Sequence, residues 1–108
     1  MNTSPMSNGH APYQIEAAET VWKEITTCQV TAIHEGRGPE FALAIRQLLE
    51  RLRSNPNQLG EELYRLPALR LRIRCAIIRP IYVDCGVSED RQIVYIRSVR
   101  LLANTGAR

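Results

Sequence analysis

Hydrophobic positions follow a helical period in the first half of the chain and a period of two in much of the second half. The most regular helical stretch covers residues 39–54, where Pro39 suits the first turn and Asn55-Pro56 ends the helix. Its apolar face is formed by residues at i, i+4, i+7 and i+11 spacing: Phe41, Ile45, Leu48 and Leu52. This pattern predicts an amphipathic helix.

A preceding amphipathic stretch, residues 18–33, predicts another helix. Trp22 lies on its apolar side, and we expect this side chain in the core. The stretch is rich in β-branched residues, which lowers its helix propensity, and Gly36 and Gly38 end it. Residues 13–17 alternate between apolar and polar and predict a short first strand.

The second half of the chain contains three β runs, residues 69–77, 79–84 and 92–101. A further run starts near Leu63 and breaks at Pro67. Because the connections are short, the three runs predict an antiparallel meander. Together with the helices they predict an α+β two-layer domain, in which a two-helix hairpin packs on a three- to four-stranded, largely antiparallel sheet.

Pro80 interrupts the second of these runs, because proline cannot donate to a strand ladder. Either that strand begins at Ile81, or it has a bulge or an edge position there. We expect one domain over residues 12–102, with a flexible lead over residues 1–11 and a flexible tail over residues 103–108.

Apolar and basic residues alternate strictly from Leu69 to Cys75. In a strand, successive side chains point to opposite faces. We therefore expect Leu69 and its apolar partners to face the core, and the cations to form a row on the open face. The apolar set is Leu69, Leu71, Ile73 and Cys75, and the basic set is Arg70, Arg72 and Arg74. Such a row suits a polyanion, whereas the alternative is an ordinary solvated face of long side chains.

The formal net charge of +3 is unevenly distributed along the chain. Residues 1–60 contain five basic and six acidic residues, net −1, whereas residues 61–108 contain nine arginines and five acids, net +4. Lys23 is the only lysine. The planar guanidinium matches phosphate, which favours phosphate recognition. The alternative is a GC-rich genome, which favours arginine codons.

The three cysteines, Cys28, Cys75 and Cys85, form no C-x-x-C pair, and neither histidine lies at a zinc-ligand spacing from them. We therefore expect no metal and no cofactor. An odd cysteine count behind a polar N-terminus favours a cytoplasmic protein. No apolar stretch approaches the roughly 20 residues that span a bilayer, so we expect no membrane partner.

Several segments together resemble the RelE/ParE superfamily of toxins from bacterial toxin–antitoxin pairs. The order β, α, α, β, β, β is similar, and the resemblance covers nearly the whole chain from Tyr13. The similar segments are Tyr13-Gln14-Ile15 with Trp22-Lys23-Glu24-Ile25, Leu48 to Pro56, Arg70 to Arg74 with Arg79-Pro80-Ile81-Tyr82, and Ile93 to Val99.

In the ribosome-dependent endoribonuclease branch of this superfamily, basic strand residues bind messenger RNA and stabilise charge on the scissile phosphate. The resemblance places Arg70 and Arg72 on two basic strand positions and Arg79 on the phosphate-stabilising position. It implies that Arg72 and Arg79 are catalytic. It further implies that RNA or a small acidic antitoxin binds at four arginines: Arg70, Arg74, Arg97 and Arg100. No cofactor is implied.

The end of the chain departs from the endoribonuclease pattern. No His, Tyr or Lys follows Tyr95, and Leu102 stands where the family has a catalytic arginine. The branch that resembles ParE, which inhibits DNA gyrase and lacks the nuclease tail, fits these residues better. Two alternatives remain: a non-catalytic domain of the same fold that binds RNA or an acidic peptide, and an unrelated α+β protein whose arginines are only solvated.

Overall fold

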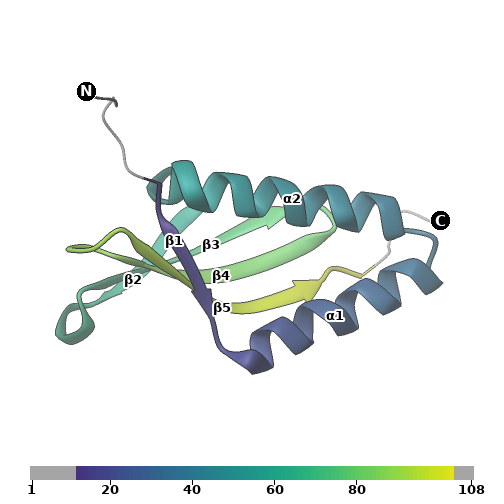
Figure 1. Cartoon of the computed structure of the whole chain (residues 1–108), viewed down its shortest axis with the longest axis horizontal. Helices are drawn as coiled ribbons and strands as arrows, with labels where there is room; N and C mark the ends of the chain where they lie inside the picture. The colour runs from purple at the N-terminus through teal and green to yellow at the C-terminus, as the bar shows by residue number, and fades with distance from the viewer. Residues whose placement is uncertain (1–11, 104–108) are drawn as a thin grey trace.

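The computed structural model describes residues 12–103. The expected lead, residues 1–11, and residues 104–108 of the expected tail lie outside this range. The elements in chain order are β1 (Gln14–Ala17), α1 (Glu19–His34), α2 (Gly38–Ser54), β2 (Glu61–Leu66), β3 (Leu71–Ile78), β4 (Ile81–Ser88) and β5 (Ile93–Leu101) (Figure 1). Short 3-10 turns, Pro56–Gln58 and Pro67–Leu69, precede β2 and β3.

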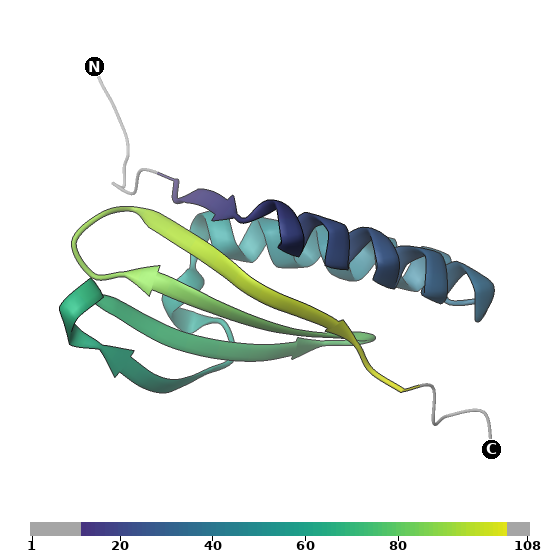
Figure 2. The ribbon, with the colours of Figure 1, turned by 90° about the horizontal axis from the view of Figure 1, so that it is seen from below.

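The strands form one mixed sheet in the order β1-β5-β4-β3-β2. β1 runs parallel to β5, and the other neighbours are antiparallel. Both helices lie on one side of the sheet, and no helix of residues 12–103 covers the other side, called the uncovered face below (Figure 2). The predicted α+β architecture and the meander of β3, β4 and β5 are confirmed. The predicted count of three to four strands is wrong: β1 and β2 both join the sheet, which has five strands.

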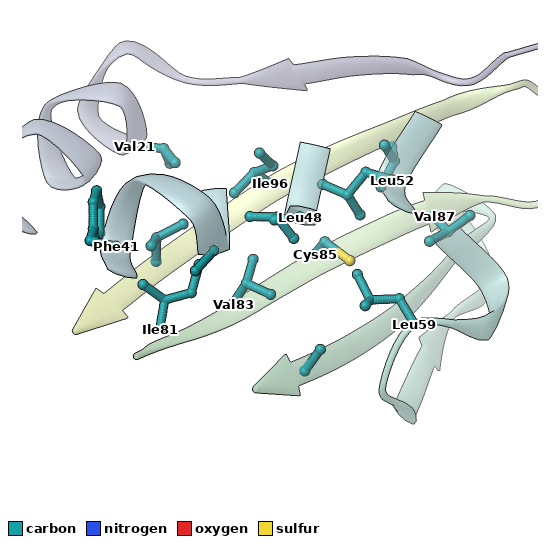
Figure 3. Close-up of a cluster of buried hydrophobic side chains, with 14 of the residues drawn as sticks. Val21, Phe41, Leu48, Leu52, Leu59, Ile81, Val83, Cys85, Val87 and Ile96 are labelled. Atoms are coloured by element: carbon teal, nitrogen blue, oxygen red, sulfur yellow. The ribbon is translucent and has the colours of Figure 1, made fainter. Parts of the chain in front are cut away.

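The core lies between the helices and the sheet (Figure 3). α2 packs on the sheet as its pattern predicts, through Phe41, Leu48 and Leu52. Burial raises the pKa of the Cys85 thiol in this core to about 11, so the thiol is protonated at neutral pH. Across the sheet, the buried side chains are Ile81, Val83, Cys85, Val87, Val94, Ile96 and Val99.

Trp22 is not a core residue, contrary to the prediction, because 44% of it is exposed. α1 contacts the sheet and α2 through positions at i, i+4, i+7 and i+11 that start at Val21: Val21, Ile25, Cys28 and Ala32. Trp22 is one residue further along, which is about 100° around the helix axis. The apolar residues of α1 form a stripe wider than its buried face.

The predicted facing of the Leu69–Cys75 alternation is also wrong. Ala76 of β3 pairs with Val83, and Arg74 pairs with Cys85. Directly paired residues share one face of a sheet, and these β4 partners are in the core. Arg72, opposite the buried Val87, therefore lies on the helix side as well.

The apolar residues of the alternation lie on the uncovered side or outside the strand. Leu71, Ile73 and Cys75 pair with Ser88, Gly86 and Asp84, and Leu71 and Ile73 lie over Gly86. Leu69 precedes the strand and is 66% exposed. Arg70 breaks the alternation because its φ is +54°.

The connection between β3 and β4 explains this reversal. Only Arg79 and Pro80 separate the two strands, so Ile78 pairs with Ile81 and the whole register follows from that pair. β4 begins at Ile81, which confirms the first of the two alternatives for Pro80. The Arg79–Pro80 peptide bond is cis.

Gly60 allows β2 to lie along β3. Its φ is +62°, and a Cβ atom there would lie 1.9 Å from the Cys75 carbonyl oxygen. Leu59, just before it, is buried against the sheet. A side chain at residue 60 would therefore push β2 away from β3 or displace Leu59 from the core.

We expect Gly60→Ala to lower the free energy of unfolding by about 3 kcal/mol, because it adds a steric clash to the cost of a left-handed backbone. Gly36→Ala is the matched control: Gly36 has a φ of +75° but nothing within 4 Å of its Cβ position. That change should cost only about 1 kcal/mol. Urea denaturation of both variants measures the difference, and equal losses would contradict the packing described for Gly60.

Candidate nucleic-acid interface

The six arginines predicted from the sequence lie in three different places. Arg72 and Arg74 are on the helix side of β3, and Arg79 is exposed in the connection to β4. The remaining three, Arg70, Arg97 and Arg100, lie on the uncovered face or at its rim.

The two predicted catalytic residues, Arg72 and Arg79, are not brought together by the fold. They are seven positions apart along the chain, which corresponds to about 23 Å at the rise of a β-strand. No single phosphate can therefore contact both side chains.

Arg74 is a buried structural residue, with only 8% of its surface exposed. Its Nε donates to the Leu59 carbonyl at 3.0 Å, and its Nη2 donates to the Gly60 carbonyl at 3.2 Å. Its Nη1 lies 3.9 Å from a Glu62 carboxylate oxygen. All three partners belong to the segment that enters β2, so Arg74 ties that segment to β3. It is not displayed for RNA or an antitoxin.

Replacing Arg74 with methionine should lower the free energy of unfolding by about 3 kcal/mol, because two carbonyls lose their donor. Arg79→Met is the control, with the same change of charge and side-chain type at an exposed position, and should stay within about 0.5 kcal/mol of the parent. Thermal and urea denaturation provide both values. A loss in Arg74→Met no larger than in Arg79→Met would show that the hydrogen bonds from Arg74 to Leu59 and Gly60 do not stabilise the fold.

Carboxylates accompany most of the other arginines at this end of the sheet. Glu89 lies 3.7 Å from Arg65 and 3.8 Å from Arg72, and Asp90 lies 4.0 Å from Arg70. Such partly exposed pairs contribute little to stability. They do reduce the positive charge that the row of arginines was predicted to present.

The uncovered face instead presents tyrosines on three strands. Tyr64 on β2 lies in one cross-strand row with Tyr95 on β5, and Ile73 and Gly86 are the positions between them. Tyr82 on β4 lies two rows away and pairs with Arg100. Tyr64 is 47% exposed.

Two of the predicted arginines lie among these tyrosines. Arg97 sits at the irregularity in the β4–β5 ladder, where its Nη1 donates to the Tyr64 hydroxyl at 3.3 Å and to Asp84 at 3.4 Å. The hydrogen bond to Tyr64 is the main cause that raises the Arg97 pKa. The Arg100 guanidinium lies 5.5 Å from the centroid of the Tyr82 ring, within cation–π range.

A hollow of about 480 Å³ adjoins Tyr95 on this face. Leu69 and Leu71 give it an apolar wall, and Arg70 and Arg91 add two cations, of which Arg70 lies 4.0 Å from Asp90 in the same lining. Arg91 was missed at the sequence level because it lies outside the alternating run, in a turn beside two acids. The order of the strands could have indicated it, because the β4–β5 turn that carries Arg91 lies at the same end of the sheet as the β2–β3 turn (Figure 1). The hollow can hold a flat ring against Tyr95 and an anion against the arginines.

No family model matches this chain, and no curated protein matches it. Within residues 12–103, no group of three or more His, Cys, Asp or Glu side chains is placed to hold a metal. No helix in that range is long and apolar enough to cross a membrane.

Proposed function

We propose that this chain is a non-catalytic RNA-binding domain of RelE/ParE-like architecture, which binds single-stranded RNA on the uncovered face of its sheet. The observation that supports this proposal is the set of tyrosines on β2, β4 and β5 with Arg97 and Arg100 between them. No helix of residues 12–103 covers them (Figure 2).

The chemistry of this face suits single-stranded RNA more than a duplex. Tyrosine rings stack on unpaired bases, and each such contact is worth about 1–3 kcal/mol. Arginine adds phosphate contacts and stacks on bases. A sheet face without a covering helix leaves both groups accessible at once, as in known sheet-based RNA-binding domains.

The RelE/ParE-like part of the proposal rests on topology. A first strand, a two-helix hairpin and a final meander follow one another in the order that the resemblance implies, with β1 parallel to β5. β2 is an addition to that order. The separation of Arg72 from Arg79 favours binding over cleavage.

The test is fluorescence anisotropy with a labelled oligouridine. Tyr82→Ala and Arg100→Gln should each weaken binding by about tenfold, as loss of one stacking or charged contact predicts. Arg46→Gln, an exposed change of the same charge on α2, should leave the affinity unchanged. Arg100→Gln should also reduce the slope of log affinity against log salt by about 0.7.

Two outcomes would overturn the proposal. One is an equal loss of affinity in Arg46→Gln and Arg100→Gln, which would mean that only net charge matters. The other is tighter binding to duplex RNA than to the single strand, because a duplex cannot stack its bases on Tyr82.

A second candidate function is a toxin component neutralised by a small acidic antitoxin, acting on messenger RNA at the ribosome or on DNA gyrase. The order of elements favours it. If it holds, inducing the chain alone in a bacterial host should arrest growth, and Arg79→Ala should relieve the arrest if cleavage is the cause. Normal growth at a confirmed high level of soluble protein would rule this function out in that host.

A further inference from the structure

A second hollow, of about 370 Å³, lies on the helix side of the sheet, where β4 turns into β5. Arg72 reaches it from β3, Asn57 from the 3-10 turn after α2, and Tyr13 from the residue just before β1. The turn contributes its remaining walls: Ser88, Glu89, Asp90, Arg91 and Gln92. The tyrosine-bearing face is on the opposite side of the sheet.

Arg72, which lines this hollow with a partly exposed side chain, has one hydrogen-bond donor that is unused. Its Nε atom is buried and has no hydrogen-bond partner, and no other buried side-chain nitrogen or oxygen of residues 12–103 is in this state. The nearest carboxylate oxygen, from Glu89, is 3.8 Å away, which is too long for a hydrogen bond. A buried polar group without a partner calls for a ligand, an ion or water to complete it.

The other lining groups add donors to this one. The Tyr13 hydroxyl and the Asn57 amide nitrogen lie 3.4 Å apart and hydrogen-bond weakly to each other. Arg91 adds a second guanidinium that has no ion pair within residues 12–103. Two guanidinium groups, an amide and a hydroxyl are the donor set that phosphate oxygens accept from.

The acids of the hollow are already compensated. Asp90 accepts a hydrogen bond from the Ser88 hydroxyl at 3.0 Å. Glu89 is shared between Arg65 and Arg72, at 3.7 and 3.8 Å. Asp90 also lies 4.0 Å from Arg70. Each acid of the hollow therefore has a cation from outside the lining, Arg65 for Glu89 and Arg70 for Asp90.

We propose that this hollow binds a phosphate group, held by Arg72 with help from Asn57, Tyr13 and Arg91. Its volume is at the small end of ligand sites, which begin at about 300 Å³, and fits a phosphate with part of one nucleoside. The phosphate can belong to a free nucleotide or to the 5′ end of an RNA. Arg91 also lines the hollow beside Tyr95, but Arg72, Asn57 and Tyr13 line only the phosphate hollow. The site therefore does not depend on RNA binding by the opposite face.

The probe is inorganic phosphate, titrated by isothermal calorimetry at constant ionic strength, with the melting temperature followed in parallel. The parent should bind it saturably and melt at a higher temperature. Arg72→Gln should weaken binding by about tenfold, the loss expected for one charge-assisted contact, and Asn57→Ala should weaken it less. Arg46→Gln, with the same charge change at an exposed position of α2, should bind like the parent.

The proposal is overturned if phosphate does not bind, if Arg72→Gln binds like the parent, or if chloride at equal ionic strength gives the same stabilisation. Circular dichroism of each variant shows that a loss of binding is not a loss of fold. Tyr82→Ala should bind phosphate normally, so failure of this site and failure of RNA binding on the other face are read separately.

Two further ligands identify the source of the phosphate. Uridine 5′-monophosphate that binds more tightly than inorganic phosphate indicates a nucleotide site. A 5′-phosphorylated oligouridine that binds more tightly than its 5′-hydroxyl counterpart, with the difference lost in Arg72→Gln, indicates an RNA end. If neither improves on inorganic phosphate, the site binds the free ion.

Discussion

The contact of the Arg74 guanidinium with the carbonyls of Leu59 and Gly60 determines how the two layers meet at the β2 edge. It buries a charge on the helix side of β3, where the meander alone would predict an apolar residue. Because these carbonyls belong to the segment between α2 and β2, the same contact positions the end of the helix layer and the start of the edge strand. Gly60 completes this arrangement, since only a residue without a side chain can approach Cys75 so closely.

Arg74 pairs with Cys85 of β4, and this register determines on which face of the sheet every other side chain of β3 lies. A shift of one residue would move every one of them to the opposite face. In the observed register, Ala76 and Ile78 contribute to the core or pack against it, whereas Ile73 is fully buried on the other side beneath its neighbours. Both faces of β3 thus contain buried residues, which explains why the alternation did not reveal the core side.

The elements were predictable where one face alone is apolar, as in α2, whose bounds of Gly38–Ser54 match the prediction to within a residue. The facing of β3 was also predictable, but from β4. Ile81, Val83, Cys85 and Val87 alternate with polar or small residues, and a two-residue connection pairs Ile78 with Ile81. That rule places Arg72 and Arg74 on the core side. By contrast, the exposure of Trp22 depends on how α1 is rotated against the sheet, which an apolar stripe this wide does not determine.

The candidate sites were less accessible to sequence analysis, because they depend on which cations meet which carboxylates. The net charge of +4 over residues 61–108 suggests a strongly basic surface. In the fold, Glu62, Glu89 and Asp90 lie beside the arginines of β2 and β3 and lower the charge that a ligand meets there.

The arginines without an ion pair within residues 12–103 include Arg79, Arg91 and Arg100, which are exposed. If the two proposals hold, recognition depends less on total charge than on the few places where a cation adjoins a tyrosine or an unused donor. Arg100 beside Tyr82 on one side of the sheet and Arg72 beside Asn57 on the other are two such places. A polyanion attracted by charge alone would have no reason to prefer either place, which is why the two proposals name a base that stacks on a tyrosine and a phosphate that accepts from Arg72.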